Sequence, residues 1–160
     1  MNFLSADEIN KTSPYKVTQV DEMSVRFSTQ NGVRYLVGLT MDIFILTENG
    51  YYMYIVNENE PQATDPLVYE TMVAVIANFF AHSKEDAMLY ICSPSDSRQA
   101  VRARLFKMWF NKTDEARHLT IKTYSHMDDG IEYFYGIILR KDNPYHEKMI
   151  NIFLDFLSDR

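Results

Sequence analysis

The chain has 160 residues and a mass of 18.8 kDa, which is enough for one well-packed domain and too short for two full ones. Apolar residues make up 46% of the sequence and only ten residues are Gly or Pro, so a disordered, collagen-like or linker-rich chain is excluded. The net charge of −6 disfavours unspecific binding to nucleic acid, and the single cysteine excludes an intramolecular disulfide and a cysteine-rich zinc site.

The first residues carry no basic stretch followed by an apolar one, which is the pattern of a secretory signal. The longest apolar runs, 73–81 and 131–139, are much shorter than the ~20 residues that cross a bilayer. We therefore expect a cytoplasmic protein without a membrane partner.

Three dipeptides predict tight reversals between strands: Asn31-Gly32, Asn49-Gly50 and Asp129-Gly130. Asn or Asp followed by Gly supplies the positive φ values that two-residue hairpin turns require. β-branched and aromatic residues flank each turn, and a buried apolar run precedes Cys92. The predicted strands are 24–29, 33–39, 43–46, 51–56, 87–92, 118–124 and 131–140, and 15–20 is an optional further strand before them. Because strand 87–92 follows a helix, we expect it to run parallel to a neighbour.

Helix starts are indicated by Asp65-Pro66, Ser93-Pro94 and Asn143-Pro144. In each pair an N-cap residue precedes a proline at the first helical position, where the missing N–H costs nothing. The predicted helices are 66–82, 94–111 and 144–157. The first is apolar over most of its surface, and the last has one apolar face.

The resulting order is (β)βββ(β)-α-β-α-β-β-α, without repeats or a linker. This order predicts a single α+β domain over residues 1–160. Its sheet is mostly antiparallel, with about six or seven strands, and three helices pack on it.

The segment most suited to binding joins strand 87–92 to helix 94–111. Ser93 and Asp96 have the spacing of a capping-box variant, so the strand leads directly into a helix N-terminus, a place that favours anions. Five basic residues and one acid give 94–112 a net charge of +4, which leaves −10 for the rest of the chain. Val101, Leu105 and Met108 are expected on the buried side of this helix. The candidate ligand-binding residues are Ser93, Ser95, Asp96, Arg98, Arg102, Arg104 and Lys107.

A simpler alternative stays open, in which this segment is only a capped helix with a solvated basic face. Other side chains give weaker indications. Cys92 could be a thiolate stabilised by the helix dipole, but it is not tied to any base and suits a small core residue. The four histidines lack zinc-ligand spacing, and we expect no metal site. Alternating tyrosines on two strands could stack on bases or a sugar, or line a sheet face beneath a helix; they are Tyr52, Tyr54, Tyr133 and Tyr135.

Parts of the sequence resemble a family of uncharacterised proteins from Bacteroidetes-type bacteria, a domain of unknown function. The resemblance spans 15–156 and depends on Leu89-Tyr90-Ile91-Cys92, Ser95 to Ala100, Arg102, Leu105-Phe106, Trp109-Phe110 and Arg140 to Tyr145. It implies a bacterial, intracellular setting and no assigned activity.

The predicted topology is also similar to the latter part of the GNAT acetyltransferase fold. Gln99, Leu105-Phe106 and Trp109-Phe110 resemble its strand-to-helix segment, one residue out of register. Those enzymes hold the coenzyme A pyrophosphate with a Gly-rich loop before the first of these helices. Here residues 57–66 contain no Gly and three acids, which would repel a pyrophosphate. The resemblance therefore implies a degenerate coenzyme A site.

We interpret the chain as a non-catalytic module that binds a small anion or an acidic protein partner through its basic helix, without a cofactor. The alternative is an acyltransferase-related domain, so whether the chain is an enzyme stays open. A third alternative is self-association through Tyr52, Tyr54 or Trp109.

Overall fold

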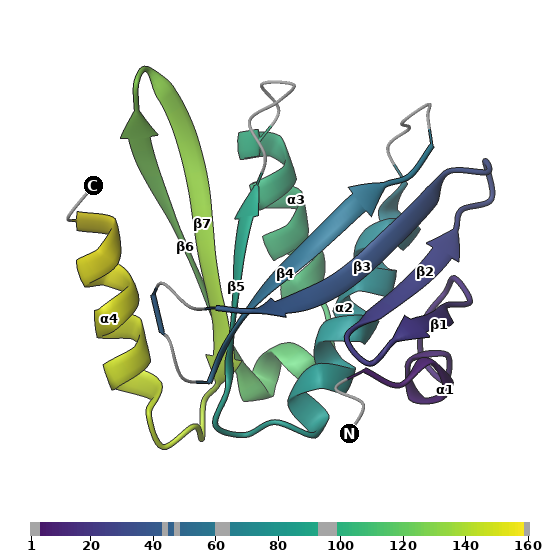
Figure 1. The fold of residues 1–160 in the computed structure, drawn as a ribbon, viewed down its shortest axis with the longest axis horizontal. Coiled ribbons are helices and arrows are strands. Elements are labelled where there is room, and N and C mark those ends of the chain that lie inside the picture. The colour runs from purple at the N-terminus through teal and green to yellow at the C-terminus, as the bar shows by residue number, and fades with distance from the viewer. Residues whose placement is uncertain (1–3, 43–44, 47–48, 60–64, 93–98, 159–160) are drawn as a thin grey trace. The chain divides into compact units, whose positions relative to one another are not determined.

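A computed structural model describes residues 4–42, 45–46, 49–59, 65–92 and 99–158. Seven strands form one sheet with the order β1-β2-β3-β4-β5-β7-β6 (Figure 1). The pairs β1–β2, β2–β3, β5–β7 and β6–β7 are antiparallel, and β4 and β5 are parallel. The predicted α+β class, its mostly antiparallel sheet and the parallel neighbour of the 87–92 strand are confirmed.

The chain divides into two compact units, of residues 1–40 with 53–83 and of residues 41–52 with 84–160. The first contains α1 (Ala6–Ile9), β1 (Thr18–Asp21), β2 (Ser24–Ser28), α2 (Pro66–Ala81) and nearly all of β3 (Arg34–Met41). Strand β4 (Gly50–Asn57) belongs to both units. The second contains β5 (Ala87–Cys92), α3 (Gln99–Asn111), the 3-10 helix η1 (Asp114–His118), β6 (Leu119–Asp128), β7 (Ile131–Arg140) and α4 (His146–Ser158).

Helix α2 follows its prediction to within one residue. Asp65 caps it by accepting the Leu67 N–H at 3.0 Å, and Pro66 is its first residue. Helix α4 begins at His146, two residues after the predicted Pro144. The reason is that the Asn143 side chain accepts the Tyr145 N–H at 2.8 Å, which holds a turn ahead of the helix.

The short helix α1 has no counterpart among the predicted elements. Its four residues are too few to show a helical period, so it depends on packing against α2. Asn78 of α2 joins the two helices, since its Oδ1 accepts the Ser5 N–H at 3.0 Å and its Nδ2 donates to Glu8 at 2.6 Å.

Of the three predicted two-residue turns, one is confirmed. Asp129 and Gly130 have φ values of 53° and 81°, and they connect the paired residues Asp128 and Ile131. At Asn31-Gly32 only the glycine has positive φ. There the Thr29 N–H donates to the Val33 carbonyl at 2.8 Å, which closes a three-residue loop.

The prediction of a hairpin at Asn49-Gly50 is wrong, because the strand expected before it, 43–46, does not form at its described residues. Ile45 and Leu46 are bent, and their N–H groups donate to the carboxylate of Asp42, which is 1% exposed. A side-chain acceptor thus replaces the strand partner. Both side chains are buried in the core beside α4. Residues 43 and 44 lie outside the described chain.

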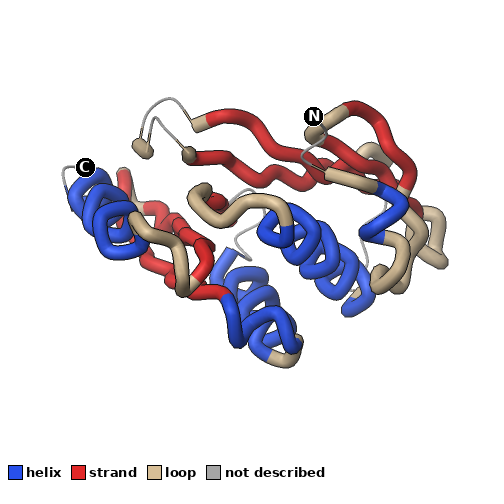
Figure 2. Tube along the Cα trace, turned by 90° about the horizontal axis from the view of Figure 1, so that it is seen from below, coloured by secondary structure: helices blue, strands red, loops and turns tan. Residues whose placement is uncertain are grey.

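In the second unit a helix covers each face of β5, β7 and β6 (Figure 2). On one face, Leu89, Ile137 and Leu139 pack against α4 residues that include Ile150 and Phe153. On the other, the Tyr90 ring lies 5.2 Å from that of Phe106 in α3. Coverage of both faces explains the continuous apolar run of β7, which lies between β5 and β6 in the sheet.

Candidate functional site on helix α3

The predicted binding segment is described only in part. Ser93, Ser95, Asp96 and Arg98 lie outside the described residues. Arg102 belongs to α3, but its side chain is not among those described. The structure therefore gives the positions of two candidate side chains, those of Arg104 and Lys107.

The buried side of α3 differs from the prediction. Among the α3 side chains that are described, Ala103, Phe106 and Phe110 are buried, with exposures of 5%, 5% and 0%, whereas Met108 is 41% exposed. The side chain of Val101, which was also expected on the buried side, lies outside the described residues. The two phenylalanine rings lie 6.2 Å apart, and Phe106 packs on Tyr90 of β5. Burying these two large rings removes more apolar surface from water than burying Leu105 and Met108 would, so the helix is rotated toward them.

The described basic residues of α3 lie on its exposed surface. Arg104 and Lys107 are three positions apart and both are exposed. No ion pair joins either of them to a carboxylate within the described part of the chain. Directly after the end of α3, the Lys112 ammonium lies 4.8 Å from the centre of the Trp109 ring, a cation–π contact. The described cations of this surface are thus directed to solvent or to the ring of Trp109.

Cys92 is the last residue of β5 and is partly exposed. Its side chain shares the α3 side of the sheet with Tyr90, two residues before it.

The tyrosines of the second unit line a sheet face beneath a helix. Tyr52, Tyr124 and Tyr133 pack at the border of the α4 core, and Tyr135 is 8% exposed within it. The Tyr124 ring lies 5.9 Å from that of Phe153 in α4. In the first unit the Tyr54 hydroxyl instead lies close over the backbone of Gly38. These contacts favour packing over ligand stacking.

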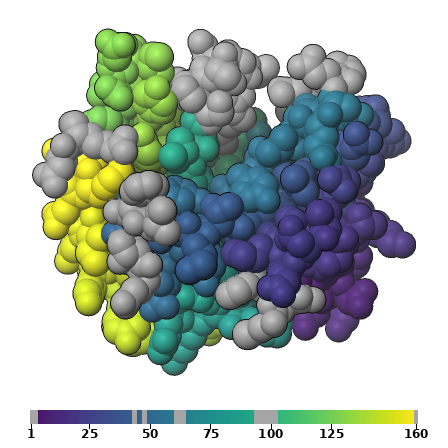
Figure 3. Space-filling model, viewed as in Figure 1, coloured from purple at the N-terminus to yellow at the C-terminus, as the bar shows by residue number. Residues whose placement is uncertain are grey.

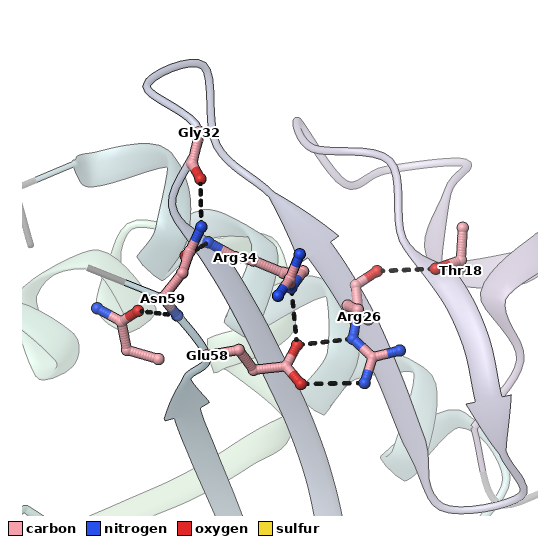
Figure 4. A network of polar contacts seen from close by, with 7 residues as sticks. Thr18, Arg26, Gly32, Arg34, Glu58 and Asn59 are labelled. Carbon is pink, nitrogen blue, oxygen red and sulfur yellow. Dashed lines mark hydrogen bonds and ion pairs between the residues drawn. The ribbon is translucent and has the colours of Figure 1, made fainter. Parts of the chain in front are cut away.

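A second polar cluster, in the first unit, was not predicted (Figure 4). The Glu58 carboxylate accepts from Nε and Nη2 of Arg26 at 2.6 and 3.0 Å, and Nε of Arg34 lies 3.5 Å from it. The hydrogen bonds from Arg26 lower the pKa of Glu58, and Glu58 in turn raises the pKa of Arg26. The neighbouring Asn59 binds the backbone of Gly32 and Arg34. Together the contacts of Glu58 and Asn59 join β2 and β3 to the residues that follow β4, which is a structural role.

Sequence reasoning could not find this cluster, because Arg26 and Glu58 are 32 residues apart and belong to no motif. The same holds for Glu8, whose carboxylate lies 2.7 Å from Nε2 of His82. No group of metal-binding side chains occurs among the described residues, and no described helix is long and apolar enough to cross a membrane.

Fold and site together define an α+β protein with a mixed sheet and a basic helix surface. A model of a family of unknown function, DUF6169, matches residues 64–155. That is more than half of the chain, and the chain belongs to this family. No curated protein and no solved structure matches the chain.

Proposed function

We propose that this protein is a non-catalytic module that binds an anionic ligand or an acidic protein surface through α3 and the segment before it. Arg98, Arg102, Arg104 and Lys107 supply the charge. Ser93, Ser95 and Asp96, which lie outside the described residues, are the remaining candidate residues of this site.

The observation that carries this proposal is the exposure of Arg104 and Lys107 without a carboxylate partner in the described part of the chain. Elsewhere in the same protein, two half-buried arginines do have such partners: Arg26 binds Glu58, and Arg140 binds Asp142 at 2.8 Å. A local charge of +4 in a chain of −6 attracts anions to this surface while the remainder repels them. Guanidinium groups also form strong hydrogen bonds with phosphate and carboxylate oxygens.

The test uses Trp109, the single tryptophan, as a fluorescent reporter on α3. Inorganic tripolyphosphate and a poly-glutamate peptide are titrated separately, at low salt and at about 0.5 M NaCl, where charges are screened beyond a few ångströms. We expect binding of at least one probe at low salt and its loss at high salt. Response to tripolyphosphate alone indicates a small anion, and response to the peptide alone indicates an acidic partner.

The deciding comparison is between two double variants with the same change of net charge. Arg104→Glu with Lys107→Glu should weaken binding about tenfold or more. Lys16→Glu with Lys141→Glu, two exposed lysines far from α3 in sequence, should leave it nearly unchanged. Equal losses in the two variants, or no binding of either probe by the wild type, would overturn the proposal.

An acyltransferase-related domain is the second candidate. It is supported by the one parallel pair, β4–β5, in an otherwise antiparallel arrangement of described pairs, with a helix before and after β5. Against it, residues 57–66 contain no glycine. Acetyl-CoA at about 100 times its dissociation constant should raise the free energy of unfolding by about 2.7 kcal/mol if a site exists. A thermal shift with acetyl-CoA, absent with sulfate, would favour this candidate.

We also propose that the 160 residues act as one domain in a bacterial cytoplasm. Strand β4 supports the proposal of one domain, because it runs without a break from one compact unit into the other. Calorimetry should then give one unfolding transition whose van't Hoff and calorimetric enthalpies agree. Two separable transitions would contradict it.

A further inference from the structure

Strand β6 presents a long edge of the sheet. It pairs with β7 on one side, and no described strand pairs with its other side. Its ten residues, Leu119–Asp128, contain neither proline nor glycine. Proteins usually shorten, bend or block such an edge, because its unpaired N–H and C=O groups bind other strands.

The tight turn after β6 determines which backbone groups face outward. In a two-residue hairpin the residues that flank the turn, here Asp128 and Ile131, exchange hydrogen bonds. Hydrogen-bonded and non-bonded pairs alternate from there along the ladder. The N–H and C=O groups of Thr123, Ser125 and Met127 therefore point away from β7.

The side chains of this edge are complementary to themselves. When two copies of β6 run antiparallel about a two-fold axis at Ser125, Thr123 of each lies opposite Met127 of the other, so their outward groups can bond. In that register Lys122 lies opposite Asp128 of the second copy, and Tyr124 lies opposite His126. Lys122 and Asp128 are both exposed and have no ion-pair partner in the part of the chain that is described.

Neighbouring registers fit less well. A two-fold axis at Tyr124 places Lys122 opposite His126, and an axis at Lys122 places two ammonium groups opposite each other. Cross-strand pairs of opposite charge stabilise a sheet, and like charges destabilise it. The chosen register also covers Met127, which is 59% exposed near the end of the β6–β7 hairpin, a segment at the surface in Figure 3 (light green).

From this self-complementarity we infer that two copies of the chain associate through β6, with two symmetric Lys122–Asp128 pairs across the junction. The interface is isologous, so every contact occurs twice and the assembly closes at a dimer. This inference does not depend on the proposed anion-binding surface of α3. It also differs from the self-association considered in the sequence analysis, whose tyrosine anchors, Tyr52 and Tyr54, lie on β4.

The test is sedimentation equilibrium of the full chain from about 1 to 200 μM, the range in which a weak dimer dissociates. Lys122→Asp and Asp128→Lys should each weaken dimerisation about tenfold or more, because two attractive pairs become repulsive. A one-to-one mixture of the two variants should dimerise again, since each aspartate then meets a lysine. The chain that carries both substitutions should also recover.

A backbone variant provides the second arm. Ser125→Pro removes an N–H that points outward and should abolish the dimer, whereas Ser125→Ala keeps the N–H and should dimerise like the wild type. Arg104→Glu with Lys107→Glu should dimerise normally, which separates this inference from the proposed function. A monomeric wild type at 200 μM would falsify the inference, as would failure of the mixed variants to associate.

Discussion

Tyr90 of β5 lies across Gly136 of β7 so closely that a Cβ atom at position 136 would be 1.9 Å from Cζ of the tyrosine. The two residues are paired in the antiparallel ladder, and Thr123 of β6 pairs with Gly136 from the other side. The Tyr90 hydroxyl reaches over the glycine to Oγ1 of Thr123 at 2.9 Å. One ring thus spans three strands and forms the surface on which Phe106 of α3 packs.

Replacing this glycine should destabilise the protein strongly. In Gly136→Ala the new methyl group must displace a ring that is only 5% exposed. We expect a loss of about 2–3 kcal/mol in the free energy of unfolding, measured by urea denaturation.

The matched control tests the cause of that loss. In a Tyr90→Ala background the methyl group meets no ring, so Gly136→Ala should cost at least about 1 kcal/mol less than in the wild type. Additive effects of the two substitutions would show that the ring is not responsible.

Alkaline pH should destabilise the fold through the same tyrosine. Burial raises the pKa of Tyr90 to about 12 from an ordinary value of 10.0, while the hydrogen bond with Thr123 acts in the opposite direction. The folded state therefore holds a proton that the unfolded state releases. This contribution to stability is complete below pH 10 and is lost as the pH rises toward 12.

Tyr90→Phe should show a smaller decrease in the free energy of unfolding between pH 9 and 11 than the wild type. Some decrease should remain, because burial also raises the pKa values of Tyr35 and Tyr51. Tyr145→Phe, at a 42% exposed position, is the control. Identical slopes in the wild type and Tyr90→Phe would contradict the assignment.

Lowering the pH should decrease the stability of the first unit, because it protonates Glu58. Its pKa lies below the ordinary 4.5 because Arg26 donates hydrogen bonds to the carboxylate. A lowered pKa contributes stability that is present above pH 4.5 and is lost as the pH falls through the pKa of the folded state. Glu58→Gln should flatten the acid limb of a stability–pH curve, and Asp155→Asn on the exposed surface of α4 should not. An unchanged acid limb in Glu58→Gln would refute this role.

The contribution of the α2 N-cap to the free energy of unfolding should be measurable by itself. Asp65 accepts the Leu67 N–H through Oδ1, and the Tyr15 hydroxyl donates to Oδ2. Asp65→Ala removes both acceptors and should cost about 1–2 kcal/mol in chemical denaturation. Asp65→Asn keeps an acceptor for the Leu67 N–H and should cost clearly less. Equal losses in the two variants would mean that the cap contributes little.

Features that depend on neighbouring residues in sequence could be predicted well. The β5 strand was expected at 87–92 and occurs there, because an apolar run between polar ends is sufficient to define a buried strand. Asp65-Pro66 and Asp129-Gly130 likewise determine a helix start and a turn through local backbone chemistry. The strand expected at 43–46 was wrong at Ile45 and Leu46, because the buried carboxylate of Asp42 competes for their N–H groups.

Helix α3 also combines features that the sequence predicts with features that it does not. Its end at Asn111 and its excess of positive charge were predictable, whereas the predicted start at Pro94 lies outside the described residues. Which of its sides is buried was not, because Tyr90 on another strand provides the surface that receives Phe106. The exposure of Met108 follows from that contact.

The sequence by itself determined the α+β class, most of the order of its elements and the concentration of positive charge on one helix, since period, capping and charge are properties of short segments. Only the tertiary structure decided that β7 lies between β5 and β6, that Glu58 binds Arg26, and that a glycine accommodates Tyr90. These relationships join residues far apart in the chain. They are selected by packing and hydrogen bonding in the folded state, which no local pattern encodes.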